Sequence, residues 1–182
     1  MSGQKPLGPE QGSVRVLTFK EGLLSPLGHD LVIVASKWKG EVTIEDREPP
    51  VGTVAIEIEA DSLTVEGPDD LSAKDRDEIQ ENIRGKVLET KKFPTVRFRS
   101  TRVASAGKGK IRVEGTLNLH GVERPLSFES ALESADGAIR VQGETPLTQT
   151  DFKIKPYKAP LGVIKVKDVV RIRWDLRIST PK

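Results

Sequence analysis

The chain has 182 residues, with 29 basic and 27 acidic side chains and a formal net charge of +2. It contains no cysteine, which excludes disulfides, thiolate chemistry and cysteine-based metal sites. Charges of both signs are interleaved along the chain, so the sequence lacks the basic patch of a nucleic-acid-binding protein, and we expect no nucleic-acid partner. Aromatic residues make up only 4%, so any core is built mainly from Val, Ile and Leu.

This length suits one domain. Residues 1–12 are polar and contain Gly and Pro, which predicts a flexible N-terminal tail ahead of one domain over residues 13–182. No run approaches the 18 apolar residues of a membrane-spanning helix. The N-terminus as written carries no signal peptide, which predicts a cytoplasmic protein; removal of a leader would make it periplasmic or secreted.

Alternating apolar and polar residues predict β-strands along most of the chain. The first expected strands are Ser13–Lys20, Leu31–Ile44 and residues 54–60. Leu31–Ile44 is either one long strand or two strands with a bend near residues 37–40, because a glycine inside a strand commonly marks a bulge or a corner.

One region has the features of a helix. Ser72 followed three residues later by Asp75 resembles a capping box, and Ile79 and the isoleucine four residues later share one face. The pattern predicts a helix over residues 72–84 and a short second turn over 86–90. The opposite face is charged, which predicts that the helix lies on the surface of the domain.

Strands resume after Pro94 and continue to the C-terminus. Residues 110–133 alternate on both sides of His120-Gly121-Val122, which predicts an antiparallel hairpin, and another turn is expected around residues 106–109. A further strand is expected over 137–144, followed by an irregular connection over about 146–166. The last strand, VVRIRWDLRIS, has the clearest alternation of the chain.

These elements predict an all-β fold with a short helical insert. About eight strands, mostly joined by short turns, each have one apolar face, and an antiparallel sheet of this size hides that face by forming a barrel or a sandwich. Eight strands that close on themselves leave an interior that side chains just fill or that holds one slender ligand. A sheet edge left open would allow a homodimer.

Spacing alone leaves both interpretations of the interior open. Four consecutive strands each have a small residue at an inward position: Ser100, Gly115, Ser130 and Gly143. Missing side chains in the middle of neighbouring strands would leave a channel. Alternatively, the glycines mark kinks, and Trp174 or Phe128 fills the gap.

The candidate chemical sites favour no enzyme. A metal site would need His29 and His120 to converge with a carboxylate such as Asp30, and both histidines lie at turns, where His, Asp and Gly serve the backbone. Adjacent residues in an extended chain point to opposite faces, so Asp30 is badly placed to orient His29 as a base. We expect no catalytic residue and no metal.

Five lysines lie in the connection before the last strand: Lys153, Lys155, Lys158, Lys165 and Lys167. They either attract an anionic head group or membrane surface, or form a solvated loop. The expected contact with a membrane is at most transient.

Two long segments carry a resemblance to a known family. RDEIQENIRGKVLETKKFPTVRFRSTRV (76–103) and VEGTLNLHGVERPLSFE (113–129), in this order and with their flanking strands, resemble the YceI family of lipocalin-like, polyisoprenoid-binding proteins. The resemblance covers residues 13–179. It implies an eight-stranded antiparallel lipocalin-like β-barrel around a hydrophobic tunnel that holds an isoprenoid chain.

The resemblance and the apolar faces together predict a non-enzymatic protein that binds, transports or stores a long apolar lipid, either a polyisoprenoid or an isoprenoid quinone. No cofactor other than such a lipid is expected. The alternatives are a filled barrel that acts as a protein-interaction or structural module, and a metal-dependent enzyme using both histidines. The residues expected to line the tunnel are Val54, Ile56, Val96, Phe98, Val113, Gly115, Leu117, Phe128, Ile172, Trp174 and Leu176. Gly115→Leu is expected to block the tunnel and leave the fold tolerable.

Overall fold

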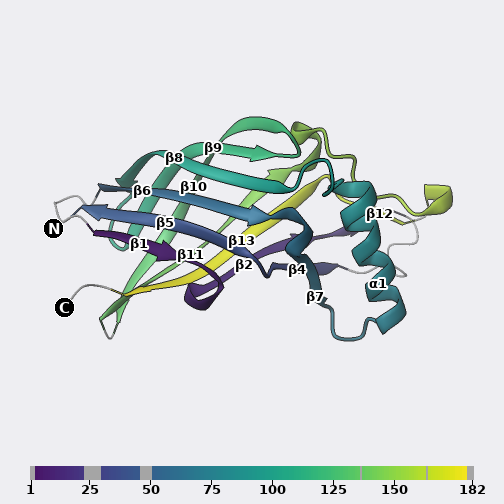
Figure 1. The fold of residues 1–182 in the computed structure, drawn as a ribbon, viewed down its shortest axis with the longest axis horizontal. Coiled ribbons are helices and arrows are strands. Elements are labelled where there is room, and N and C mark those ends of the chain that lie inside the picture. Colours follow the sequence, from purple (N-terminus) through teal and green to yellow (C-terminus); the bar gives the residue numbers. More distant parts are fainter. Residues whose placement is uncertain (1–2, 23–29, 46–50, 136, 163, 180–182) are drawn as a thin grey trace.

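The computed structural model describes residues 3–22, 30–45, 51–135, 137–162 and 164–179. Figure 1 shows a curled antiparallel sheet with one short α-helix at one end, so the predicted all-β class with a helical insert is confirmed. The curl brings strands that are distant in the chain together. As a result, Lys5 near the N-terminus donates a hydrogen bond from Nζ to the carbonyl oxygen of Ser179. The concave side of the sheet therefore encloses one shared interior.

The main sheet has eleven strands in the order β1-β5-β6-β8-β9-β10-β11-β13-β2-β4-β7. Their bounds are β1 Gly3–Leu7, β2 Gly12–Thr18, β4 Leu31–Ala35, β5 Trp38–Glu45, β6 Val51–Glu59, β7 Leu63–Gly67, β8 Thr95–Ser105, β9 Lys110–Leu119, β10 Val122–Ala135, β11 Ala138–Thr148 and β13 Val169–Ser179. A second, two-stranded sheet pairs β3 (Lys20–Glu21) with β12 (Lys165–Val166).

Bends account for two of the three strands found beyond the eight or so predicted, and β1 is the third. The segment Leu31–Ile44 is two strands, β4 and β5, and β6 passes through a short 3-10 turn into β7. The segments 36–37 and 59–62 stay paired at the bend. Ser36 N donates to the Ser62 carbonyl at 3.2 Å, and Glu59 N donates to the Lys37 carbonyl at 3.1 Å. The 3-10 turn breaks the alternation, which is why the sequence pattern missed β7.

The described part of the predicted flexible tail, residues 3–12, belongs instead to the folded domain. Gly3–Leu7 forms β1 and pairs with β5 in the register Leu7↔Gly40, and a 3-10 turn at Pro9–Gln11 leads into β2. Leu7 is buried in the core. The segment GQKPL holds a single large apolar residue, so no periodicity marked it as a strand.

The predicted helix is confirmed as α1, Ala73–Asn82. Its N-cap is Ser72, whose Oγ accepts a hydrogen bond from Asp75 N at 3.1 Å and so satisfies one of the free N–H groups of the first turn. A π-helical turn, Ile83–Val87, follows directly, close to the expected second turn.

Both predicted hairpin turns are confirmed. Residues His120 and Gly121 have φ values of 53° and 72°, and they join β9 to β10 with Val122 opposite Leu119. Positive φ at both central residues is the geometry that suits the twist of a two-residue hairpin. At the other turn, Ala106 N donates to the Lys110 carbonyl at 3.0 Å.

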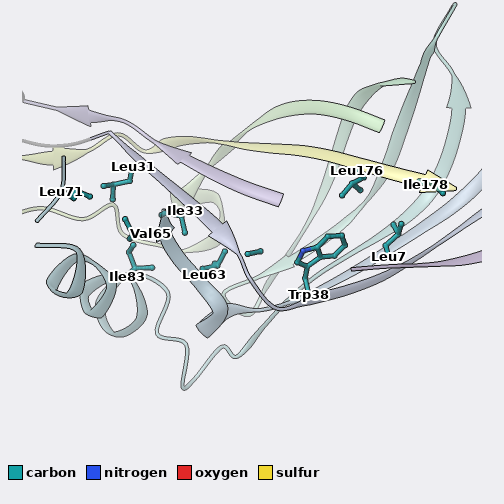
Figure 2. Close-up of a cluster of buried hydrophobic side chains, with 11 residues drawn as sticks. Leu7, Leu31, Ile33, Trp38, Leu63, Val65, Leu71, Ile83, Leu176 and Ile178 are labelled. Atoms are coloured by element: carbon teal, nitrogen blue, oxygen red, sulfur yellow. The ribbon is translucent and has the colours of Figure 1, made fainter. Parts of the chain in front are cut away.

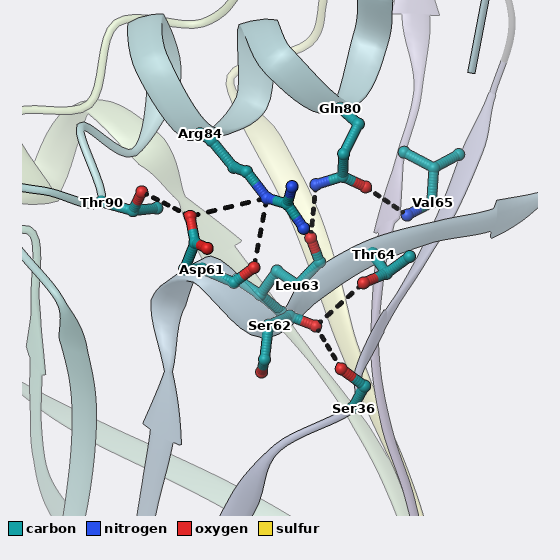
Figure 3. A network of polar contacts seen from close by, with 9 residues as sticks. All are labelled: Ser36, Asp61, Ser62, Leu63, Thr64, Val65, Gln80, Arg84 and Thr90. Carbon is teal, nitrogen blue, oxygen red and sulfur yellow. Dashed lines mark hydrogen bonds and ion pairs between the residues drawn. The ribbon is translucent and has the colours of Figure 1, made fainter. Parts of the chain in front are cut away.

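The outer edge of β7 is covered by side chains of α1 rather than by another strand (Figure 3). Gln80 accepts a hydrogen bond from Val65 N at 2.9 Å and donates to the Leu63 carbonyl at 2.7 Å. Arg76 donates to the carbonyls of Val65 and Glu66 at 2.8 and 3.0 Å. Polar side chains on the helix thus take the place of a neighbouring strand.

The inward side chains form two buried clusters. Figure 2 shows the first, which extends from Leu31 and Ile83 near α1 to Leu7 and Ile178 at the far end. The second gathers around Leu117, with residues of β11, β13 and the connection between them.

Cross-strand ion pairs occupy the outward face of the sheet. Arg140 donates two hydrogen bonds to Asp175, at 2.9 and 2.7 Å, and these lower the pKa of the Asp175 carboxyl. Hydrogen bonds from Arg171 and Arg173 lower the pKa of Glu144 in the same way. These carboxylates are ionised more readily in the folded chain than in the unfolded one.

We expect the melting temperature to fall as the pH drops below about 4, the ordinary pKa of unfolded Asp and Glu side chains. Because their folded-state pKa is lowered, their contribution is complete above the unfolded-state pKa and is lost as the pH falls through the folded-state value. Calorimetry between about pH 7 and 2 measures the melting temperature. In Asp175→Asn the melting temperature should fall less steeply at acidic pH than in the parent. A melting temperature that stays constant down to about pH 2 would contradict the prediction.

Candidate functional site

A cavity of about 750 Å³ lies inside the curled sheet. Sites for small molecules occupy about 300–1,000 Å³, so this volume is large enough for a ligand. The cavity extends from Val103 and Ile111, beside the β8–β9 turn, to Tyr157 and Val166 at the end that carries α1. The interior is therefore not filled by side chains.

All but one of the predicted lining residues line this cavity. They come from strands β6, β8, β9, β10 and β13: Val54, Ile56, Val96, Phe98, Val113, Leu117, Phe128, Ile172, Trp174 and Leu176. Gly115 is not in the lining. That these side chains contact a ligand stays a prediction.

The two glycines among the small inward residues leave no gap in the wall, as the alternative interpretation expected. A Cβ on Gly115 would lie 2.4 Å from the Arg99 carbonyl oxygen and 2.6 Å from Cζ of Phe98, so the Phe98 ring occupies the space above this glycine. A Cβ on Gly143 would lie 2.2 Å from Cζ2 of Trp174. The glycines let aromatic rings lie flat against the sheet, and the free volume lies beyond those rings.

Three aromatic rings form a continuous row along this wall. The ring centroids of Phe98 and Phe128 are 5.4 Å apart, and those of Phe128 and Trp174 are 4.7 Å apart. Trp174 Nε1 donates to Ser130 Oγ at 3.1 Å, which satisfies both buried polar atoms. The row gives a rigid apolar surface that crosses from β8 over β10 to β13.

Polar groups in the lining are few, and some are already engaged. Gln149 is buried and donates from Nε2 to the Lys167 carbonyl at 2.9 Å, and Ser130 is held by Trp174. Asp75, Glu78 and Asn82 belong to the lining only at the α1 end. The charged groups of the lining therefore lie only at the α1 end, which suits a long apolar chain with a polar group at that end.

His120 does not belong to the cavity lining. His120 lies at the β9–β10 turn, with Nε2 3.0 Å from Oε2 of Glu89 and its ring 4.1 Å from that of Phe93. His29 lies outside the described residues. Within the ranges that the structure describes, His, Cys, Asp and Glu form no group of three that could hold a metal ion.

The sequence interpretation missed part of the lining. Tyr157, Ala159, Ile164 and Val166 line the cavity from a segment expected to be irregular. Alternation is present there, in Tyr157-Lys158-Ala159 and again in 164–166, but a Pro-Leu-Gly turn separates the two short runs. Ile79, on the apolar face of the predicted helix, lines the α1 end.

A family model described as "YceI-like domain" matches residues 27–178 of the chain. The chain belongs to this YceI-like family. A UPF0312 protein of Shewanella denitrificans is 29% identical to this YceI-like chain over 155 residues, which cover 81% of the chain and 76% of that protein.

Two solved structures share the fold of this YceI-like chain. BcnA of Burkholderia cenocepacia superposes with a TM-score of 0.71 at 17% identity, covering 92% of this chain and 96% of that one. A polyisoprenoid binding domain from Saccharophagus degradans gives a TM-score of 0.67 at 14% identity and covers both chains completely. Among the described residues, no helix is long and apolar enough to cross a membrane.

Proposed function

We propose that this YceI-like protein binds a polyisoprenoid or an isoprenoid quinone in its cavity and carries or stores it without changing it chemically. The observation that carries the proposal is the elongated cavity of about 750 Å³, lined mainly by Val, Ile, Leu and aromatic side chains. The shared fold with the polyisoprenoid binding domain of Saccharophagus degradans supports the same ligand class.

Apolar burial alone supplies enough affinity for such a ligand. Each methylene group removed from water contributes about 0.8 kcal/mol, so ten buried methylenes contribute about 8 kcal/mol before the cost of ordering the chain. The walls offer few free polar partners, so the lipid tail rather than its head group determines binding. Selectivity then depends on the width and length of the cavity.

The test is to identify the lipid that the protein retains. After expression in cells that make isoprenoids, native mass spectrometry is expected to show one bound lipid per chain, and solvent extraction should release isoprenoid species. A polyprenol and an isoprenoid quinone with equal tails are expected to bind within about tenfold of each other. A chain that remains empty in such cells, and takes up neither compound afterwards, would refute the proposed function.

A further inference from the structure

A lysine-rich hairpin covers one end of the cavity. Its two arms, residues 157–159 and 164–166, run antiparallel, with Val166 N donating to the Tyr157 carbonyl at 3.0 Å and Ala159 N donating to the Ile164 carbonyl at 2.9 Å. Residues 160–162 form the turn at its tip. We call this element the lysine hairpin. It lies at the end of the molecule that carries α1, where Figure 1 labels β12, and β12 belongs to its second arm.

The two faces of the lysine hairpin differ in character. Side chains alternate along each arm, and Tyr157, Ala159, Ile164 and Val166 all line the cavity. Lys158 and Lys165 pair with each other across the arms, so they share the opposite face. Like charges directly opposite one another destabilise a strand pair. The stability of the hairpin therefore does not explain why Lys158 lies opposite Lys165.

The charged side chains of the hairpin and its flanks, residues 153–167, are all positive. Between residues 153 and 167 the chain has five lysines and no acidic residue. None of these lysines forms an ion pair with another described residue, although the arginines of the neighbouring sheet do, such as Arg171 and Arg173 with Glu144. The flanking Asp168 is engaged by Thr150, whose Oγ1 donates to it at 2.6 Å. Glu21 lies opposite Lys165 in the β3–β12 pair, so one of the five lysines faces a carboxylate and the hairpin keeps a net positive charge.

A large apolar side chain stands at the tip of this basic element. Leu161 is 98% exposed, far more than Val169, the other exposed large apolar residue among those described, at 42%. Its φ of 66° lies in the left-handed region, which is strained for a leucine. An exposed apolar tip surrounded by lysines has the chemistry of a segment that binds an anionic membrane surface.

We propose that the lysine hairpin docks this protein on an anionic lipid bilayer, with Leu161 inserted at the head-group level and the lysines against the lipid phosphates. The inner face of the same hairpin lines the cavity, so docking places that end of the cavity at the membrane. The other element there, α1, carries Asp75, Glu78 and further carboxylates and is unsuited to an anionic surface. This inference goes beyond the proposed function, because docking does not require an occupied cavity.

The experiment measures sedimentation of the full chain with vesicles that contain no isoprenoid. Vesicles of phosphatidylcholine with about 30% phosphatidylglycerol are expected to bind the protein at low salt, and pure phosphatidylcholine vesicles are not. Each lysine near such a surface contributes about fivefold in partitioning, so Lys158→Glu with Lys165→Glu should weaken binding by at least about 30-fold. Leu161→Asp should weaken it about tenfold further, and aspartate tolerates the left-handed turn.

A matched control is Lys108→Glu with Lys110→Glu, which changes the net charge equally at the exposed β8–β9 turn at the opposite end. Unchanged binding of this control, beside the loss in the hairpin variant, supports the proposal. Equal loss in both variants would show that only total charge matters, and would overturn it. Failure of the parent chain to bind either vesicle would assign the lysines to another partner and would also overturn it. Both results leave the proposed lipid cavity untouched.

Discussion

Replacing Val96 and Ile172 together by tryptophan is expected to weaken lipid binding by at least about 100-fold. Both residues line the cavity, and both keep accessible surface although they face inward, so free volume lies beside them. Two indole rings would occupy part of that volume. Losing only four methylene contacts costs about 3 kcal/mol, which already corresponds to about 100-fold in affinity.

The measurement is titration with a polyprenol, followed by native mass spectrometry of the purified variant. The matched control is Arg99→Trp with Arg177→Trp, which places the same two side chains at exposed positions on the same strands, β8 and β13. The control should bind lipid as the parent does. If the Val96 and Ile172 variant retains its lipid with unchanged affinity and melts as the parent does, the ligand does not occupy this cavity.

Gly115→Leu is expected to destabilise the fold by about 3 kcal/mol instead of simply blocking a tunnel. The new Cβ would meet the Arg99 carbonyl oxygen at 2.4 Å, and a backbone atom within a paired strand cannot move aside as a flexible side chain can. For a chain of this length, such a loss lowers the melting temperature by about 6–12 °C. Thermal unfolding of the lipid-free variant and of the lipid-free parent measures this difference in melting temperature directly.

Gly85→Leu provides the control for this substitution. Gly85 lies in the π-helical turn after α1, and a Cβ there meets nothing within 4 Å. We expect its melting temperature to stay within about 2 °C of the parent. A Gly115→Leu variant that melts like the parent but no longer holds lipid would restore the expectation drawn from the sequence.

Most of the fold could be predicted because its signals are local. The alternation in Val169–Ser179 reflects which side chains face the interior, and Ser72 with Asp75 marks the start of α1 through a single capping interaction. The errors fall where local signals are weak. β1 has one buried apolar residue, Leu7, and its place is determined by pairing with β5, a partner distant in the chain.

The site was predictable as a face but not as a volume. The period of two identified which side chains point inward, and ten of the eleven chosen residues line the cavity. The volume depends on side-chain conformation, which spacing does not encode. Phe98 lies over Gly115 and Trp174 over Gly143, so the gaps left by the glycines are occupied. The lysine hairpin was missed as lining because its runs are only three residues long.

The hydrogen bonds from α1 to β7 have a consequence for how the protein behaves at high concentration. The outermost strand of an open sheet offers its backbone groups to any extended chain that approaches, and this is a common start of fibril growth. Here the backbone groups of Leu63 and Val65 already form hydrogen bonds with the side chains of Gln80 and Arg76. Two copies that meet at the β7 edge cannot extend the sheet there by strand pairing, so α1 protects this edge against aggregation.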